Sequence, residues 1–318
     1  MNKHICFLKR VYRCALCLLM LLFTSTSVAE DKSLLISSNF SSVNGIKLHY
    51  LSAGQGETVI ILHGFPHYAA LWERTIKRLS QDYHVVVPDN RGYGLSSKPK
   101  GVDAYKIDVL AADVAKLIMH IGNNEKVHLI GHDWGGTLAW HVAETYPELI
   151  DKLVVINAPP LSTFLELLVN NENQSKASSY MNYLKSGKFE EKHKEEGASL
   201  IWAIGFDSLF NKQLLDERDK DIFFKHWNSI ETLEAAINWY RANIPETLDN
   251  NFAPFTLSKT PALLIWGENE RVFVPQIPEL LAEGVENYQY VIVPNVGHSP
   301  FLENEATTSK IIEQFLSY

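Results

Sequence analysis

Cysteine is nearly absent from this chain: the 318 residues include three, and all three lie within the first 17 positions. If that segment is removed, the rest of the chain can form no disulfide bond and must be stabilised by its hydrophobic core. Internal repeats and low-complexity tracts are also absent, which excludes repeat architectures. The length is sufficient for one large α/β domain with an insertion.

Long hydrophobic runs are missing as well. The apolar run at residues 14–23 has ten residues, about half of what a membrane-spanning helix needs. Four basic residues precede this run and TSTSVA follows it. The pattern predicts a signal peptide over residues 1–29, cleaved after Ala29, rather than a membrane anchor. We therefore expect a protein that is exported to a periplasm or secreted, with no stable membrane insertion after cleavage.

Clusters of basic residues are a third absence. The formal net charge is −8, and it becomes −12 when the four basic residues of the predicted signal peptide are removed. An acidic chain without basic clusters is poorly suited to bind nucleic acid or anionic lipid. A small neutral partner fits this composition better.

What the chain does contain is a series of Val/Ile/Leu-rich runs that alternate with amphipathic stretches. This alternation predicts an α/β fold with a mostly parallel sheet, buried on both faces. The predicted strands lie at residues 47–54, 58–64, 84–89, 126–132, 151–159, 261–267 and 289–295. Residues 159–254 show helical patterns and no strand run, which predicts an inserted helical cap. The core then consists of residues 30–158 and 255–318.

The predicted strand at 126–132 ends in the motif GHDWGG, Gly131 to Gly136. Its glycines allow the tight strand-to-helix turn that lifts one side chain above the sheet, where α/β-hydrolases carry their nucleophile. Here that residue is Asp133, and the N-terminus of the following helix would keep its carboxylate ionised. The same residue could instead serve only as a helix N-cap, so the motif alone leaves both interpretations open.

Two partners follow in the chain order that this fold requires, which is nucleophile, acid, histidine. His298 comes just after a predicted strand, in VPNVGHSP, and Glu268 and Glu270 come just after another, in LLIWGENER. All these groups lie at the carboxyl ends of predicted strands. We therefore expect a catalytic triad of Asp133, His298 and one of the two glutamates.

The loop HGFP, residues 63–66, follows a third strand. In α/β-hydrolases this loop supplies one N–H of an oxyanion hole, and the residue after the nucleophile supplies the other. These would be the backbone N–H groups of Phe65 and Trp134, whereas His63 is expected to be structural. Proteins that share this motif make a sharp turn here, and X-Pro is the only bond at which cis is accessible at low cost, so we also expect the Phe65–Pro66 peptide bond to be cis.

Together, HGFP, DNRGYGLSS, GHDWGG, WGENE and NVGHSP resemble the motifs of epoxide hydrolases of the α/β-hydrolase fold, over roughly residues 43–318. This resemblance implies that Glu270 is the acid, three residues after Gly267, although Glu268 stays open. It implies no metal and no organic cofactor. Haloalkane dehalogenases share the aspartate nucleophile and remain an alternative, distinguished by the chemistry of the leaving group.

The same resemblance assigns two tyrosines of the cap as proton donors to an epoxide oxygen. INWYRANIP contains Tyr240, and QSKASSYMNYLKSGKFEE contains Tyr180, with Tyr183 as the reserve for the second position. With Phe65 and Trp134, Tyr240 and Tyr180 would line the site of a small neutral hydrophobic epoxide.

A carboxylate nucleophile suits a saturated carbon because the product is an ester, which water can cleave, whereas a serine would form a stable ether. The expected reaction is therefore hydrolysis of an epoxide to a vicinal diol through an aspartyl ester, with His298 as the general base.

One group of dehalogenases has an asparagine at the position of Phe65, and another has an arginine at the position of Trp134. A secreted binding protein or effector without catalysis is a third possibility, and the chain could be a monomer or a homodimer.

Overall fold

The computed structural model describes residues 35–122, 125–248, 252–257 and 259–318. The chain divides into two units, and the second, Ile36–Tyr318, carries all of the helices and strands described below. The predicted signal peptide, residues 1–29, lies outside the described residues and stays a prediction. None of the described helices is both long enough and apolar enough to cross a membrane.

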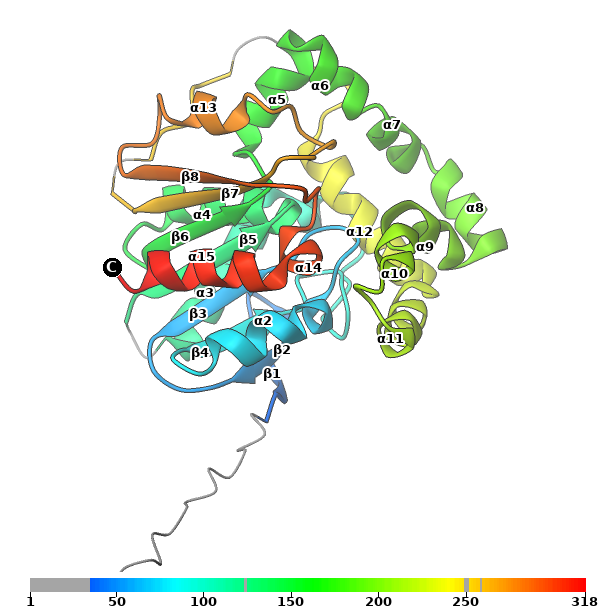
Figure 1. The fold of residues 1–318 in the computed structure, drawn as a ribbon. Helices are drawn as coiled ribbons and strands as arrows, with labels where there is room; N and C mark the ends of the chain where they lie inside the picture. The colour runs from blue at the N-terminus through cyan, green and yellow to red at the C-terminus, as the bar shows by residue number, and fades with distance from the viewer. Residues whose placement is uncertain (1–34, 123–124, 249–251, 258) are drawn as a thin grey trace, which may run out of the picture. The chain divides into compact units, whose positions relative to one another are not determined.

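Eight strands form one sheet in the order β1-β2-β4-β3-β5-β6-β7-β8 (Figure 1). The pairs β1–β2 and β2–β4 are antiparallel, and the other neighbours are parallel. The bounds are β1 Ser37–Val43, β2 Ile46–Ala53, β3 Thr58–Leu62, β4 His84–Pro88, β5 Val127–His132, β6 Ile150–Ile156, β7 Ala262–Gly267 and β8 Tyr288–Val293. Strands β3, β5 and β7 are buried along their whole length. The predicted α/β fold with a mostly parallel sheet is confirmed.

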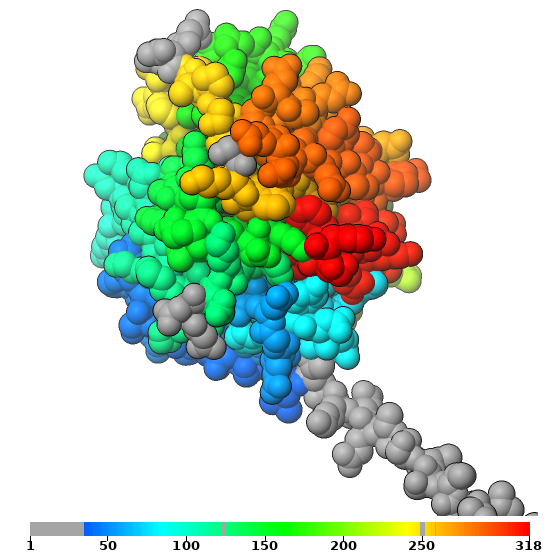
Figure 2. Space-filling view, turned by 90° about the vertical axis from the view of Figure 1, so that its left-hand side faces the viewer, coloured from blue at the N-terminus to red at the C-terminus, as the bar shows by residue number. Residues whose placement is uncertain are grey.

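Helices cover both faces of this sheet. Helices α2 and α15 lie side by side on one face and α3 and α4 on the other (Figure 1). In Figure 2 the C-terminal end of the chain, in red, lies at the surface beside the cyan segment that contains α2. The bounds are α2 Glu73–Leu79, α3 Ile107–Ile121, α4 Trp134–Thr145, α13 Ile277–Leu281, α14 Pro300–Glu303 and α15 Glu305–Leu316, with 3₁₀ helices at Ala69–Trp72 and Val102–Tyr105.

Two strands differ from the expectation. The sequence pattern does not predict β1, because its residues, SSNFSSV, include only two large apolar side chains. Strand β8 is present, but the prediction that it is buried on both faces is wrong, since Gln289–Ile292 are exposed. The physical reason is that β8 lies at the edge of the sheet and has a neighbouring strand on one side only.

The insertion between β6 and β7 consists of helices joined by short turns from Leu161 to Asn243, and its described residues after Asn243 form no helix. Its helices are α5 Leu161–Asn170, α6 Glu172–Ala177, α7 Tyr180–Lys185, α8 Lys188–Glu196, α9 Ser199–Gly205, α10 Asp207–Asn211, α11 Glu217–Trp227 and α12 Ile230–Asn243. Trp202, Phe206, Phe223 and Trp227 are buried and pack against one another. This aromatic cluster packs the helices of the insertion together and also contacts the α/β core, since Trp227 packs against Phe65 and Phe206 against His67.

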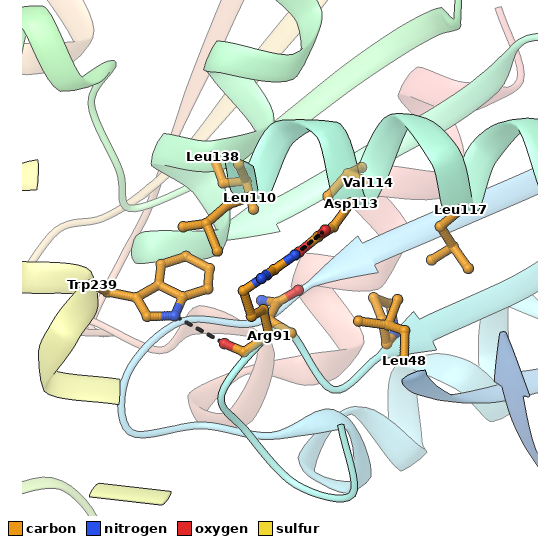
Figure 3. Close-up of a pocket in the computed structure, with 10 residues that line it drawn as sticks. Leu48, Arg91, Leu110, Asp113, Val114, Leu117, Leu138 and Trp239 are labelled. Atoms are coloured by element: carbon orange, nitrogen blue, oxygen red, sulfur yellow. Dashed lines mark hydrogen bonds and ion pairs between the residues drawn. The ribbon is translucent and has the colours of Figure 1, made fainter. Parts of the chain in front are cut away.

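A buried ion pair joins Arg91, in the loop after β4, to Asp113 on α3, and α12 packs beside it. Arg91 donates hydrogen bonds to both carboxylate oxygens of Asp113, at 2.6 and 2.7 Å, and both side chains are buried. The indole N–H of Trp239, on α12, donates to the Arg91 carbonyl oxygen at 3.0 Å. Figure 3 shows this pair in a small cavity whose other walls are largely apolar. Removing one partner of such a pair costs about 3–5 kcal/mol, so the pair fixes the loop whose Arg91 carbonyl accepts the hydrogen bond from α12.

Candidate active site

The corner between β5 and α4 places Asp133 above the sheet. Its backbone has φ 53° and ψ −126°, a strained conformation for a residue with a side chain. The turn depends on glycines: a Cβ atom at Gly131 would lie 2.3 Å from the Gly135 carbonyl oxygen. Asp133 occupies the N-cap position, but its side chain accepts no capping hydrogen bond. The interpretation of Asp133 as a simple helix cap is therefore wrong.

The two carboxylate oxygens of Asp133 face different partners. Oδ1 accepts a hydrogen bond from the backbone N–H of Phe65 at 2.7 Å, and Oδ2 lies 3.5 Å from His298 Nε2. Burial would raise the pKa of Asp133, but His298 and the backbone N–H of Trp134 outweigh it and lower this pKa. The carboxylate is therefore ionised, with Oδ1 on the Phe65 N–H of the predicted oxyanion hole and Oδ2 facing His298.

The loop HGFP approaches Asp133 closely. A Cβ atom at Gly64 would lie 2.1 Å from Asp133 Oδ1, so only glycine admits the carboxylate here. The Phe65–Pro66 bond is cis, as predicted. His63 Nε2 accepts a hydrogen bond from the Asn90 N–H, and Nδ1 donates to the Gly64 carbonyl. Both ring nitrogens are thus used to hold the loop, which is the structural role expected for His63.

Glu270 is the glutamate that contacts the histidine. His298 Nδ1 lies 2.7 Å from Glu270 Oε2, whereas Glu268 accepts a hydrogen bond from the Asn295 N–H. Burial lowers the pKa of His298, but the negative charges of Glu270 and Asp133 outweigh it and raise this pKa to about 10. Glu270, His298 and Asp133 thus contact one another in series, with the imidazolium of His298 between the two carboxylates.

Asn157 and His132, which the sequence did not predict as part of the site, hold the loops of Glu270 and His298 in position. Asn157, which is fully buried, accepts from the Gly267 N–H and donates to the Gly297 carbonyl, both at 2.8 Å. His132 Nε2 lies 2.7 Å from the His298 carbonyl oxygen. A polar residue directly after a buried strand is the signal that could have marked Asn157. Its amide joins the loop of the acid to the loop of the histidine.

Tyr240, on α12, packs against the two residues of the predicted oxyanion hole. It is 2% exposed, and its ring meets the rings of Phe65 and Trp134 edge-on at 5.7 and 5.1 Å. Burial raises the pKa of Tyr240 well above its ordinary value, and the negative charge of Asp133 raises it further. The hydroxyl is therefore protonated at neutral pH and close enough to Asp133 to sense its charge.

Tyr180 begins α7 and has a similar environment. Although 37% of its surface is exposed, burial is the largest influence on its hydroxyl, and with the Asp133 charge it raises the pKa of Tyr180 well above the ordinary value. A hydrogen bond with Tyr240 has the opposite effect and lowers the pKa of Tyr180. Tyr183, the reserve candidate, packs edge-on against Phe189 instead. The Tyr180 hydroxyl is thus influenced by Tyr240 and Asp133, whereas the ring of Tyr183 contacts Phe189.

The walls beside Asp133 are aromatic. Trp227 packs edge-on against Phe65 and donates its indole N–H to the Pro66 carbonyl at 3.1 Å. Phe273 lies 6.0 Å from His298, measured between ring centroids. Sequence reasoning did not single out Trp227 or Phe273, because buried aromatic residues are common in any core. These walls suit a hydrophobic, uncharged molecule.

The cavity of Figure 3 is a separate feature, because neither Asp133 nor His298 lines it. Among the described residues, no group of three or more His, Cys, Asp or Glu side chains is arranged to hold a metal ion.

Comparison with known proteins places this geometry in context. Residues 57–305 match the family described as alpha/beta hydrolase fold. Epoxide hydrolase 3 of Mus musculus is 32% identical over 80% of this chain and 70% of its own length. The AB hydrolase superfamily protein YfhM of Bacillus subtilis is 33% identical over 88% of this chain and 98% of its own length. The crystal structure of a Bacillus megaterium epoxide hydrolase with an inhibitor has a TM-score of 0.80 and 31% identity, covering 88% of this chain and 100% of that one.

Proposed function

Because the chain belongs to the epoxide hydrolases of the α/β-hydrolase fold, we propose that it converts an epoxide to a vicinal diol through a covalent ester on Asp133. One observation carries the proposal. The Asp133 carboxylate has Oδ1 bound by the Phe65 N–H and Oδ2 directed toward His298, and it acts on the pKa of two buried tyrosine hydroxyls.

In the first half-reaction, Asp133 Oδ2 attacks an oxirane carbon and the carbon–oxygen bond of the ring breaks. Tyr240 and Tyr180 bind the epoxide oxygen, and one of them gives it a proton as its charge develops. Because Oδ1 already lies against the Phe65 N–H, it becomes the carbonyl oxygen of the ester without moving. The products of this step are a hydroxyalkyl ester and a tyrosinate.

Alkylation also changes His298. The neutral ester no longer supplies the charge and hydrogen bond by which Asp133 raises the pKa of His298, so this pKa falls. His298 then loses a proton, which balances the proton taken up by the tyrosinate. The neutral imidazole that results, still oriented by Glu270, is the base required for the second half-reaction.

In the second half-reaction, His298 takes a proton from water and the hydroxide attacks the carbonyl carbon of the ester. The N–H groups of Phe65 and Trp134 stabilise the resulting oxyanion. When the intermediate collapses, His298 protonates the departing diol oxygen. The new carboxylic acid of Asp133 then returns its proton to His298, which restores the starting state.

The activity test is a panel of neutral alkyl and aryl epoxides, with bromoalkanes of matching size as a second arm. We expect diol from the epoxides and no bromide from the bromoalkanes, because Phe65 and Trp134 stand where dehalogenases carry an asparagine or an arginine. Bromide release without diol would favour the haloalkane dehalogenase. No product in either arm would favour a binding protein without catalysis.

The two cap tyrosines give a second test. Replacing both Tyr240 and Tyr180 by Phe is expected to slow alkylation of Asp133 by about 10²–10⁴-fold, the usual contribution of general acid catalysis. Each single replacement is expected to slow it less. The measurement is the rapid-mixing rate of ester formation. Tyr183→Phe, on the same helix as Tyr180, is the matched control and should react like the wild type; a slow Tyr183→Phe with a fast Tyr180→Phe would reverse the assignment.

We also propose that the protein is exported after cleavage behind Ala29, on the strength of the N-terminal pattern alone.

A further inference from the structure

Gln174 is a fully buried amide at the boundary between the cap and the core. It lies on α6 and all its polar side-chain groups are used. Its Oε1 accepts from the Val274 N–H at 3.0 Å, and its Nε2 donates to the Val272 carbonyl and to Ser178 Oγ, both at 2.9 Å. A buried amide with all its hydrogen bonds made fixes the segments that it joins.

The first of these segments holds the catalytic acid. Glu270 Oε1 accepts hydrogen bonds from the N–H groups of Val272 and Phe273, at 2.5 and 3.4 Å, while Oε2 faces His298. Gln174 binds this loop at Val272 and Val274, on either side of Phe273. The amide therefore grips the short turn whose N–H groups orient the Glu270 carboxylate.

The second segment carries a proton donor. Ser178, which is buried, lies two residues before Tyr180, and its carbonyl accepts from the Met181 N–H in the first turn of α7. Because Gln174 Nε2 binds Ser178 Oγ as well as the Val272 carbonyl, one side chain connects the start of α7 to the loop of the acid.

We propose that Gln174 is a positioning residue that keeps Glu270 and Tyr180 in a fixed relation, and so aligns the groups of both half-reactions. This inference rests on the proposed function. An amide is suited to the task because it offers one acceptor and two donors in a single plane. A methionine of similar size would offer neither the acceptor nor the donors.

Glu270 acts on the reaction through the charge state of His298, so a pH profile reports on its position. The other groups that face His298 are Asp133, His132 and His67, and Glu303 binds the backbone N–H groups on both sides of it. Burial lowers the pKa of His132 to about 4, and it lowers the pKa of His67 well below its ordinary value. Both are neutral near pH 7, which leaves Glu270 as the carboxylate paired with His298 once Asp133 is esterified.

The test compares Gln174→Met with Asn243→Leu in single-turnover experiments between pH 4 and 9. A displaced Glu270 raises the pKa of His298 less, so in Gln174→Met the acid limb of ester hydrolysis is expected to move down by about half a unit to one unit. The displaced Tyr180 is expected to slow alkylation roughly 10- to 100-fold. Asn243 is the matched control, because it is a buried amide that ties α12 to the core through Ile107 and Tyr105, away from the acid loop. Its variant should keep the acid limb of the wild type.

Ser178→Ala removes only the contact of Gln174 with the start of α7, whereas Gln174→Met also removes its contacts with the acid loop. It is expected to slow alkylation and to leave the acid limb in place, since the contacts of Gln174 with the acid loop remain. An unshifted acid limb in Gln174→Met, or a shift of equal size in Asn243→Leu, would overturn the inference while the reaction itself stands. If the wild type forms no ester at all, the proposed function fails first.

Discussion

A His298→Gln variant is expected to stop after the first half-reaction and to accumulate the alkylated enzyme. In the proposed mechanism, ester formation needs the Asp133 carboxylate and the two tyrosine hydroxyls, whereas ester cleavage needs a base that activates water. His298 Nε2 lies 3.5 Å from Asp133 Oδ2 and is the ring nitrogen that does not face Glu270. Glutamine preserves hydrogen bonding but accepts no proton at neutral pH, so steady-state turnover should fall by on the order of 10⁴-fold or more.

Intact-mass analysis after addition of a reactive epoxide measures this directly. The variant should gain the mass of one epoxide, and peptide mapping should locate the gain on the segment that contains Asp133. Glu268→Gln is the control, because Glu268 binds the Asn295 N–H and does not contact His298. It should turn over like the wild type and show no lasting adduct. If His298→Gln remains unmodified by an epoxide that the wild type hydrolyses, His298 must act before any ester forms.

The second prediction concerns the oxygen atoms of Asp133. In a single turnover in heavy-oxygen water, the label is expected on Asp133 and the diol is expected to be almost unlabelled. In the proposed mechanism, water attacks the carbonyl carbon of the ester, so the original Oδ2 leaves with the diol and solvent oxygen replaces it. This route is favoured because Oδ1 lies against the Phe65 N–H, a donor that stabilises a tetrahedral carbonyl intermediate and that attack on the epoxide carbon would not need.

The measurement uses enzyme in excess over epoxide and mass analysis of both the diol and the Asp133 peptide. A second turnover supplies the internal control, because the labelled carboxylate should then transfer its label to the next diol. Label in the first diol together with an unlabelled Asp133 would show that water attacks the epoxide directly. Asp133 would in that case be a base, although the geometry of its contacts would be unchanged.

The sequence alone predicts the parts of this protein whose physics is local. The Val/Ile/Leu runs specify the central strands because burial on both faces requires apolar side chains at successive positions. The glycines around Asp133 predict the tight turn, since no residue with a Cβ atom fits at Gly131. Where local composition is a poor guide, the prediction fails: the serine-rich β1 is missed, and the exposure of β8 depends on its place at the edge of the sheet.

The sequence by itself determined a mostly parallel sheet with an aspartate, a glutamate and a histidine at the ends of its strands, because apolar strand runs and turn residues are local patterns. Only the tertiary structure decided which side chains meet. The residues alone left Glu268 and Glu270 open, and the N–H groups of Val272 and Phe273 orient Glu270 toward His298. Contacts such as that of Gln174 with Val272, 98 residues apart, follow from the packing of the cap on the core. No local pattern encodes them, because a buried amide looks the same in sequence whichever loop it binds.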